Sequence, residues 1–208
     1  MKCYLTGAGD FVGAEHFLPS DKDLIVAFDG GLNSLQKAGI KPQLFVGDSD
    51  SVEGPVPADL ERIALPVAKN YTDMMIAAEE AYTRGCRTFY LFGATGGRID
   101  HTLGNIQLVA NLTKKGCLVY LIGEDFWITA VHNGKMTFKK DLKGYFSVYS
   151  LSDVSKGVTE KNVKYEIENY TLENSDPRAI SNEFIGEEGE ISVEEGTLII
   201  CVESLNGI

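Results

Sequence analysis

Short apolar runs alternate with segments of helical periodicity through the first 124 residues of the chain. The runs are typical of buried strands, and glycine follows the helical segments, where it can end a helix. Strands are predicted over 2–6, 23–28, 43–46, 62–67, 87–92 and 117–122, and helices over 32–38, 73–84 and 102–115. This alternation predicts an α/β fold with a doubly wound, mostly parallel, Rossmann-like sheet.

The pattern changes after Gly123, because short strand-like runs follow one another with no convincing helix between them. The predicted strands are 126–131, 136–138, 145–151, 163–167, 191–193 and 198–202. Asn133-Gly134 is a strong signal for the turn of a β-hairpin. We therefore expect a C-terminal antiparallel β-sandwich, with the domain boundary between 1–124 and 125–208.

Composition narrows the classes of partner. The 208 residues are 44% hydrophobic and carry a formal net charge of −11, which argues against a nucleic-acid or anionic-membrane surface. No run approaches the ~18 apolar residues of a membrane span. Gly7 interrupts the N-terminal apolar run too early for a signal peptide, so a cytoplasmic location is expected. The four cysteines form no CxxC pair and are expected to be core thiols.

Acidic residues gather where predicted strands end. Asp48 and Asp50 follow the strand 43–46, and such a pair suits a hard cation such as Mg²⁺, which prefers oxygen ligands. Asp29, Asp73 and Asp100 also stand at strand ends or helix starts. Ligands bind outside the carboxyl ends of strands in doubly wound sheets, so we expect these groups to converge with the glycine-rich turns 29–31 and 93–97.

Two other enzyme classes share part of this pattern. Gly7, Gly9 and Gly13 form a relaxed dinucleotide fingerprint, and Asp29 stands where a nicotinamide-binding fold places its ribose acid. An NAD(P)-dependent oxidoreductase would leave the other acids unexplained. The run 48–52 also resembles the nucleophile loop of haloacid-dehalogenase-type phosphatases, although those place it after the first strand. No P-loop motif is present, which argues against an ordinary P-loop kinase.

The combination of blocks resembles the thiamine pyrophosphokinase family. The matching blocks stand in the family's order: Asp29-Gly30-Gly31, Gly47-Asp48-Ser49-Asp50-Ser51, Lys69-Asn70-Tyr71-Thr72-Asp73, Gly96-Gly97-Arg98-Ile99-Asp100-His101 with Asn105, and Ile180-Ser181-Asn182-Glu183-Phe184. The resemblance implies pyrophosphate transfer from ATP to the thiamine hydroxyl with release of AMP. It also implies an α/β catalytic domain, a C-terminal β-sandwich, and a homodimer with active sites between subunits.

Residue roles follow from the resemblance. The implied Mg²⁺ and phosphate-handling set is Asp48, Asp50, Asp73 and Asp100. The implied ATP site is Asp29, Gly30, Gly31, Lys69, Asn70, Thr72, Gly96, Gly97, Arg98, His101 and Asn105. Ser181 and Asn182 would help to hold thiamine. This set suits the chemistry, because phosphoryl transfer depends mainly on positioning and charge neutralisation.

Two alternatives stay open on the sequence. A nucleotide- or thiamine-sensing module without catalysis would use the same binding residues, with the β domain as a partner surface. Trp127, the single tryptophan, is either a stacking platform for a ligand or a core residue of the β domain.

Overall fold

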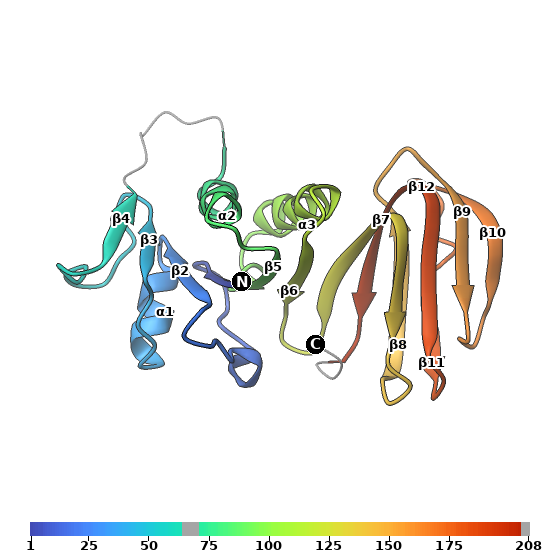
Figure 1. Ribbon diagram of the computed structural model, residues 1–208, viewed down its shortest axis with the longest axis horizontal. Helices are drawn as coiled ribbons and strands as arrows, with labels where there is room; N and C mark the ends of the chain where they lie inside the picture. Colours follow the sequence, from blue (N-terminus) through green and yellow to red (C-terminus); the bar gives the residue numbers. More distant parts are fainter. Residues whose placement is uncertain (64–70, 205–208) are drawn as a thin grey trace. The chain divides into compact units, whose positions relative to one another are not determined.

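The computed structural model describes residues 1–63 and 71–204, and these contain an α/β region followed by antiparallel strands (Figure 1). This arrangement confirms the predicted fold class. Contacts divide the chain into one compact unit of Met1–Leu108 with Leu121–Glu124 and another of Val109–Tyr120 with Asp125–Ile208. No helix among the described residues is long and apolar enough to cross a membrane.

Five parallel strands form the sheet of the first unit, in the order β4-β3-β2-β1-β5. They are β1 (Lys2–Thr6), β2 (Leu24–Phe28), β3 (Leu44–Val46), β4 (Glu61–Ile63) and β5 (Thr88–Phe92). All five residues of β2 are buried, as expected of a strand covered on both faces. The predicted strand 62–67 is confirmed only as far as Ile63, because residues 64–70 lie outside the described residues.

Helices cover both faces of this sheet. Helices α1 (Gly31–Lys37) and α2 (Asp73–Thr83) lie on opposite sides of the strands (Figure 1). Chain order explains this arrangement: the crossover through α1 runs from β2 to β3 and that through α2 from β4 to β5, in opposite directions along the sheet. Right-handed crossovers in opposite directions place their helices on opposite faces. The sheet is therefore doubly wound.

Aromatic packing connects strands β1 and β5 to the segment that follows β1. The rings of Tyr4 and Phe17 lie 5.0 Å apart, and those of Phe17 and Phe92 lie 5.1 Å apart. The Tyr4 hydroxyl donates to the carbonyl oxygen of Leu18 at 2.8 Å. Only a short 3-10 helix, η1 (Ala14–His16), interrupts this segment. These contacts fix the ends of β1 and β5 beside each other.

Helix α3 (Ile99–Lys114) and strand β6 (Leu118–Ile122) have residues in both units. Helix α3 begins three residues before the predicted start at 102. The earlier start brings Asp100 and His101 into the first turn of the helix. The glycine-rich turn after β5 is therefore shorter than the sequence pattern indicated.

The second unit contains six further strands, all paired antiparallel. They are β7 (Trp127–Phe138), β8 (Lys143–Ser150), β9 (Val154–Lys161), β10 (Ile167–Glu173), β11 (Asn182–Ile185) and β12 (Gly189–Val202). Strand β12 changes partner along its length: Glu190 to Glu195 pair with β9, whereas Leu198 to Val202 pair with β8. One long strand thus joins two sets of strands, as at the corner of a sandwich.

The predicted hairpin at Asn133-Gly134 is wrong. Strand β7 runs straight through both residues, and the predicted strands 191–193 and 198–202 are parts of one strand, β12. Val193 pairs with Gly134 and Thr197 with His132, so a β-bulge lies between these pairs. Asn133 adopts a φ of +44°, and its Oδ1 accepts a hydrogen bond from the Gly196 N–H at 2.8 Å. Positive φ therefore serves a bulge here and not a turn.

Segments 154–161 and 163–167 also differ from the prediction. Strand β9, which the sequence pattern did not indicate, occupies the first. The predicted strand 163–167 is wrong, because Val163 forms only an isolated bridge with Phe184 and β10 begins at Ile167. Trp127 is a core residue, only 1% exposed, with its ring 6.2 Å from that of Phe138.

Candidate active site

A pocket lies at the carboxyl ends of β1 and β5, where the strand order reverses direction. Doubly wound sheets bind ligands at this position because the chain leaves the two strands towards opposite sides. The cavity measures about 540 Å³. It is lined by Ala8, Gly9, Phe28, Asp29, Thr72, Asp73, Met74, Gly93, Ala94, Thr95, Gly96, Gly97, Arg98, Asp100, His101, Gly104 and Asn105.

Most of the residues predicted for the ATP site and for the Mg²⁺ and phosphate-handling set line this pocket. Those brought together are Asp29, Thr72, Asp73, Gly96, Gly97, Arg98, Asp100, His101 and Asn105. Gly30, Gly31, Asp48 and Asp50 are not among the lining residues, and Lys69 and Asn70 fall outside the described residues. Ser181 and Asn182 belong to the second unit.

Two turns form one continuous wall of the pocket. The Gly7 N–H donates to the Phe92 carbonyl at 2.9 Å, and the Gly9 N–H donates to the Gly93 carbonyl at 3.0 Å. A Cβ on Gly9 would collide with the Thr95 carbonyl oxygen. The glycines after β1 are therefore required by the close packing of the two turns, and a ligand can approach bare backbone there.

The same geometry removes the reason for the dinucleotide interpretation. A dinucleotide fold places pyrophosphate on the N-terminus of an α-helix that follows the glycine turn. Residues 7–23, all of which the structure describes, contain only the three-residue η1. The glycine spacing after β1 thus reflects packing.

Asp29 and the loop after β3 lie next to each other. The Asp29 N–H donates to the Val46 carbonyl at 3.3 Å, and a Cβ on Gly47 would lie 2.7 Å from the Asp29 carboxylate. The Asp50 N–H donates to Oδ1 of Asp48 at 3.1 Å, which folds the loop into a turn. Both Asp48 and Asp50 are exposed. The carboxylates therefore stand beside the strand ends, facing solvent.

Helix α1 secures this loop. The Asn33 side chain donates to the Ser51 carbonyl at 2.9 Å and accepts from the Glu53 N–H at 2.7 Å. Gly30 is the N-cap of α1, and Gly31 is buried where an added Cβ would collide with the carbonyl oxygen of Thr6. Glycine at 31 thus lets α1 approach β1 closely, which fixes the position of the acidic loop.

The donor set suits a hard divalent cation. Among residues 1–63 and 71–204, no three His, Cys, Asp or Glu side chains form a ready metal cluster. Mg²⁺ does not require one, because it commonly binds one or two carboxylates and completes its shell with water and substrate phosphate. Asp48 and Asp50, exposed and two residues apart, meet that requirement.

Arg98 and Asp100 form a two-pronged ion pair. Arg98 Nη2 lies 2.5 Å from Asp100 Oδ2, and Arg98 Nε lies 3.1 Å from Oδ1. The hydrogen bonds from Arg98 hold the pKa of the Asp100 carboxyl below its usual range. Both side chains are exposed. A guanidinium held in this way presents planar donors that also match a phosphate group.

Thr72 and Asn105 have clear structural contacts. Thr72 is the N-cap of α2, and its hydroxyl accepts from the Met75 N–H at 3.2 Å, which confirms the predicted cap. The Asn105 amide donates to the Ala94 carbonyl at 2.7 Å and ties α3 to the turn after β5. Both side chains thus help to fix the shape of the pocket.

Phe28 and Met74 were not predicted to line the site. Both are buried, at 7% and 3% exposure, and both line the pocket. Phe28 is the last residue of β2 and Met74 follows Asp73 in α2, so each read as a core residue. Their place next to predicted polar residues is the one sequence signal that could have indicated a role.

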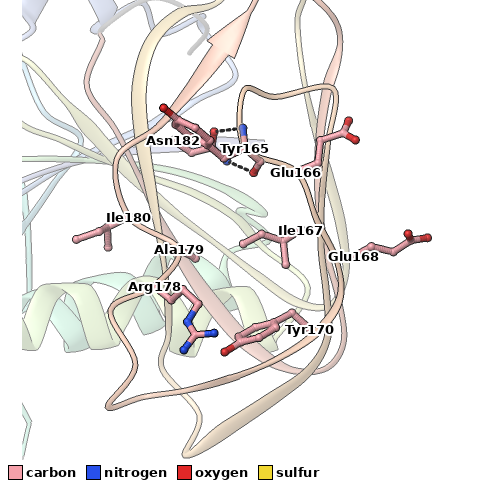
Figure 2. Close-up of a pocket in the computed structure, with 9 residues that line it drawn as sticks. All are labelled: Tyr165, Glu166, Ile167, Glu168, Tyr170, Arg178, Ala179, Ile180 and Asn182. Atoms are coloured by element: carbon pink, nitrogen blue, oxygen red, sulfur yellow. Dashed lines mark hydrogen bonds between the residues drawn. The ribbon is translucent and has the colours of Figure 1, made fainter.

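A second pocket, of about 390 Å³, lies in the second unit (Figure 2). It is lined by Tyr165, Glu166, Ile167, Glu168, Tyr170, Arg178, Ala179, Ile180 and Asn182. Asn182 is 4% exposed, whereas Ser181 is exposed, and Figure 2 shows the two hydrogen bonds that join Asn182 to Tyr165. Of the predicted Ser-Asn pair, Asn182 thus lines a hollow in the β unit, and Ser181 lies between the lining residues Ile180 and Asn182 without lining it.

Comparison with known families gives two matches along the chain. Residues 16–121 match the model described as "Thiamin pyrophosphokinase, catalytic domain". Residues 135–198 match "Thiamin pyrophosphokinase, vitamin B1 binding domain".

Individual relatives agree with these matches. The thiamine pyrophosphokinase of Bacillus subtilis (strain 168) is 32% identical over 183 residues, which cover 85% of this chain and 86% of that protein. A crystal structure of thiamine pyrophosphokinase from Bacillus subtilis superposes with a TM-score of 0.89 at 27% identity, covering 99% of this chain and 100% of that one. The Geobacillus thermodenitrificans structure gives a TM-score of 0.85 at 28% identity, with both chains fully covered.

Proposed function

The chain belongs to the thiamine pyrophosphokinase family, and we propose that its pocket at the ends of β1 and β5 holds the ATP that it uses. It is a thiamine diphosphokinase: it transfers the pyrophosphoryl group of ATP to the hydroxyl of thiamine, giving thiamine diphosphate and AMP. The observation that carries the assignment of the pocket is the convergence of two glycine-rich turns, Arg98 and several acids at one crevice. Bare backbone can approach phosphate there, and Arg98 supplies positive charge.

We assign nucleotide binding to the predicted set, part of which lines this pocket. It comprises Asp29, Gly30, Gly31, Lys69, Asn70, Thr72, Gly96, Gly97, Arg98, His101 and Asn105. Gly30 and Gly31 act by bringing α1 close to β1, which supports the loop 47–51. Arg98 and Lys69 would neutralise charge that develops on the phosphates during transfer. The thiamine hydroxyl must lose a proton, which a carboxylate of the acidic set or a metal-bound hydroxide would accept.

Asp48, Asp50, Asp73 and Asp100 would hold Mg²⁺. The cation would supply charge neutralisation and in-line alignment of the phosphates. Asp48 and Asp50 contribute exposed carboxylates from one turn, and Asp73 lies in the first turn of α2. Asp100 carries the Arg98 ion pair, so any role at a metal requires Arg98 to exchange Asp100 for a phosphate. That exchange would place the guanidinium on the nucleotide.

We further assign ATP binding and catalysis to residues 1–124 and thiamine binding to residues 125–208, where Ser181 and Asn182 lie. We also propose a homodimer with active sites at the subunit interface. Tyr145 and Tyr149, on one face of β8, are 51% and 42% exposed, as expected of a surface that a second copy covers. We also propose a cytoplasmic location, where ATP is available.

An activity assay tests the function. The protein is incubated with ATP, Mg²⁺ and thiamine, and the products are separated by chromatography. Thiamine diphosphate and AMP are expected in equal amounts, with no turnover when EDTA removes the metal. Folded protein that forms neither product with Mg²⁺, Mn²⁺ or Co²⁺ would refute the assignment. Sedimentation velocity tests the dimer separately.

A further inference from the structure

The Asn182 side chain uses its full hydrogen-bonding capacity inside the protein. Its Nδ2 donates to Glu160 Oε2 at 2.6 Å and to the Tyr165 carbonyl at 2.8 Å. Its Oδ1 accepts from the Tyr165 N–H at 3.0 Å and the Glu183 N–H at 2.8 Å. An amide has two donor hydrogens and two acceptor lone pairs, so none is left for a ligand. If the amide were flipped, its NH₂ group would face the N–H donors of Tyr165 and Glu183. These partners therefore allow only one orientation of the amide.

Glu160 is the side-chain partner in this network. It lies in β9 between Ile167 of β10 and Ile191 of β12, and it is 0% exposed. Oε2 accepts from Asn182, whereas Oε1 has no hydrogen-bond partner within the described part of the chain. Burial raises the pKa of this carboxyl to about 7. Burying a carboxyl group that makes only one hydrogen bond destabilises the fold. An apolar side chain at this position would therefore give a more stable fold.

Ser181, unlike Asn182, has an exposed side chain. Its backbone adopts a φ of +57°, which a non-glycine residue rarely takes up. Its N–H donates to the Ser147 hydroxyl at 3.1 Å. Its own hydroxyl makes no hydrogen bond within residues 1–63 and 71–204. Ser181 therefore presents a free hydroxyl on a backbone that Asn182 anchors one residue later.

Resting on the proposed function, we propose that Glu160 is a positioning residue for the thiamine side of the site. It fixes the Asn182 amide, and Asn182 in turn fixes the Tyr165 wall of the pocket and the strained turn at Ser181. The free polar group that meets the substrate is then the Ser181 hydroxyl. No part of the sequence pattern pointed to Glu160, which reads as an ordinary surface acid between Thr159 and Lys161.

Two substitutions at one position separate positioning from charge. Glu160→Met removes the acceptor for Asn182 Nδ2 while keeping an unbranched side chain that fits a core. It should raise the KM for thiamine about tenfold, with kcat and the KM for ATP changed less than about twofold. Glu160→Gln keeps an acceptor oxygen and should restore the KM for thiamine to within about threefold of the unmodified protein.

Val158→Ala is the matched control. Val158 lies two residues before Glu160 in β9 and is also 0% exposed, and its apolar side chain can make no hydrogen bond. This variant should lose thermal stability but keep the KM for thiamine. Folded Glu160→Met with an unchanged KM for thiamine would overturn the proposal. So would a Val158→Ala variant that raises this KM as much, because the effect would then be general loosening of the unit.

A readout without turnover keeps the proposal testable if the assay finds no activity or Glu160→Met does not fold. In nitrogen-15 NMR spectra, Glu160→Gln should shift the side-chain amide resonances of Asn182 and leave those of Asn174, which contacts Asp153, in place. Unshifted Asn182 resonances would contradict the contact itself. Shifted resonances in a protein without turnover would leave the contact standing and refute only the proposed function.

Discussion

Asp50 carries one of the two carboxylates after β3, and its side chain is exposed while its N–H is bound to Asp48. Asp50→Asn keeps the shape of the side chain and removes the charge that a cation requires. We expect kcat to fall about 100-fold or more, because charge stabilisation at a reacting phosphate is typically worth that much. Thermal unfolding should be unchanged, and Asp21→Asn, an exposed acid away from the pocket, is the control. Equal rates for the two variants would exclude a metal role.

Glu160 should also make the stability of the protein depend on pH. Its folded-state pKa is raised to about 7, whereas the unfolded value is 4.5. The folded state therefore binds more protons between these values, and the free energy of unfolding falls as pH rises through them. Between pH 5 and pH 8, the ionisation of Glu160 should lower the free energy of unfolding by about 2 to 3 kcal/mol.

Glu160→Gln removes this dependence. Urea unfolding of both proteins at pH 5, 6.5 and 8 measures it: the stability difference between variant and parent should grow with pH in favour of the variant. A difference that stays constant would show that Glu160 titrates normally in the folded protein.

Helix α2 begins at a cap that the sequence predicted. Thr72→Ala leaves the Met75 N–H without its side-chain acceptor, so the free energy of unfolding should fall by about 1 kcal/mol. Thr83→Ala, at the other end of the helix, is the comparison, because the Thr83 hydroxyl donates to the Glu79 carbonyl of its own helix. Its effect should be near zero. Equal losses for the two variants would indicate that the cap contributes nothing.

The bulge between β7 and β12 supplies another prediction. Gly196 has a φ of +125°, and a Cβ there would collide with the Ser155 hydroxyl. Gly196→Ala should destabilise the protein by about 2 kcal/mol or more, from strain and collision together. Gly186 has a φ of +86° with no atom within 4 Å of the added Cβ, so Gly186→Ala should show strain alone, about 1 kcal/mol. Thermal unfolding of both variants measures the difference, and equal losses would contradict the collision.

Most elements of the first unit were predictable because the apolar runs of β1, β2 and β3 are almost wholly buried and the helices end close to a glycine. In the second unit, Asn133-Gly134 has the local preferences of a hairpin, but pairing along the whole of β12 outweighed them. Strand β9 was missed because it contains Lys156, Gly157 and Glu160, and no rule of periodicity expects a buried glutamate. Such residues follow from tertiary contacts and not from local pattern.

At the scale of the whole molecule, the position of the site was predicted from the sheet topology, which brings the carboxyl ends of parallel strands to one edge. Acids and glycines at strand ends were expected to meet; Asp29, Asp73 and Asp100 do line one pocket, whereas Asp48 and Asp50 are not among its lining residues. The apolar members, Phe28 and Met74, were not predictable, because an apolar residue that lines a pocket reads like one that fills a core. The network around Asn182 could not be predicted either, since its partners Glu160 and Tyr165 lie about 20 residues away along the chain.

The location of the nucleotide is the most direct test of this account. A crystal structure is determined with Mg²⁺, thiamine and α,β-methylene ATP, in which the bond broken by pyrophosphate transfer is replaced by one that does not react. We predict the triphosphate between the turns after β1 and β5, within reach of Arg98 and with Mg²⁺ on Asp48 or Asp50. Density for the nucleotide anywhere other than this pocket would contradict the central claim.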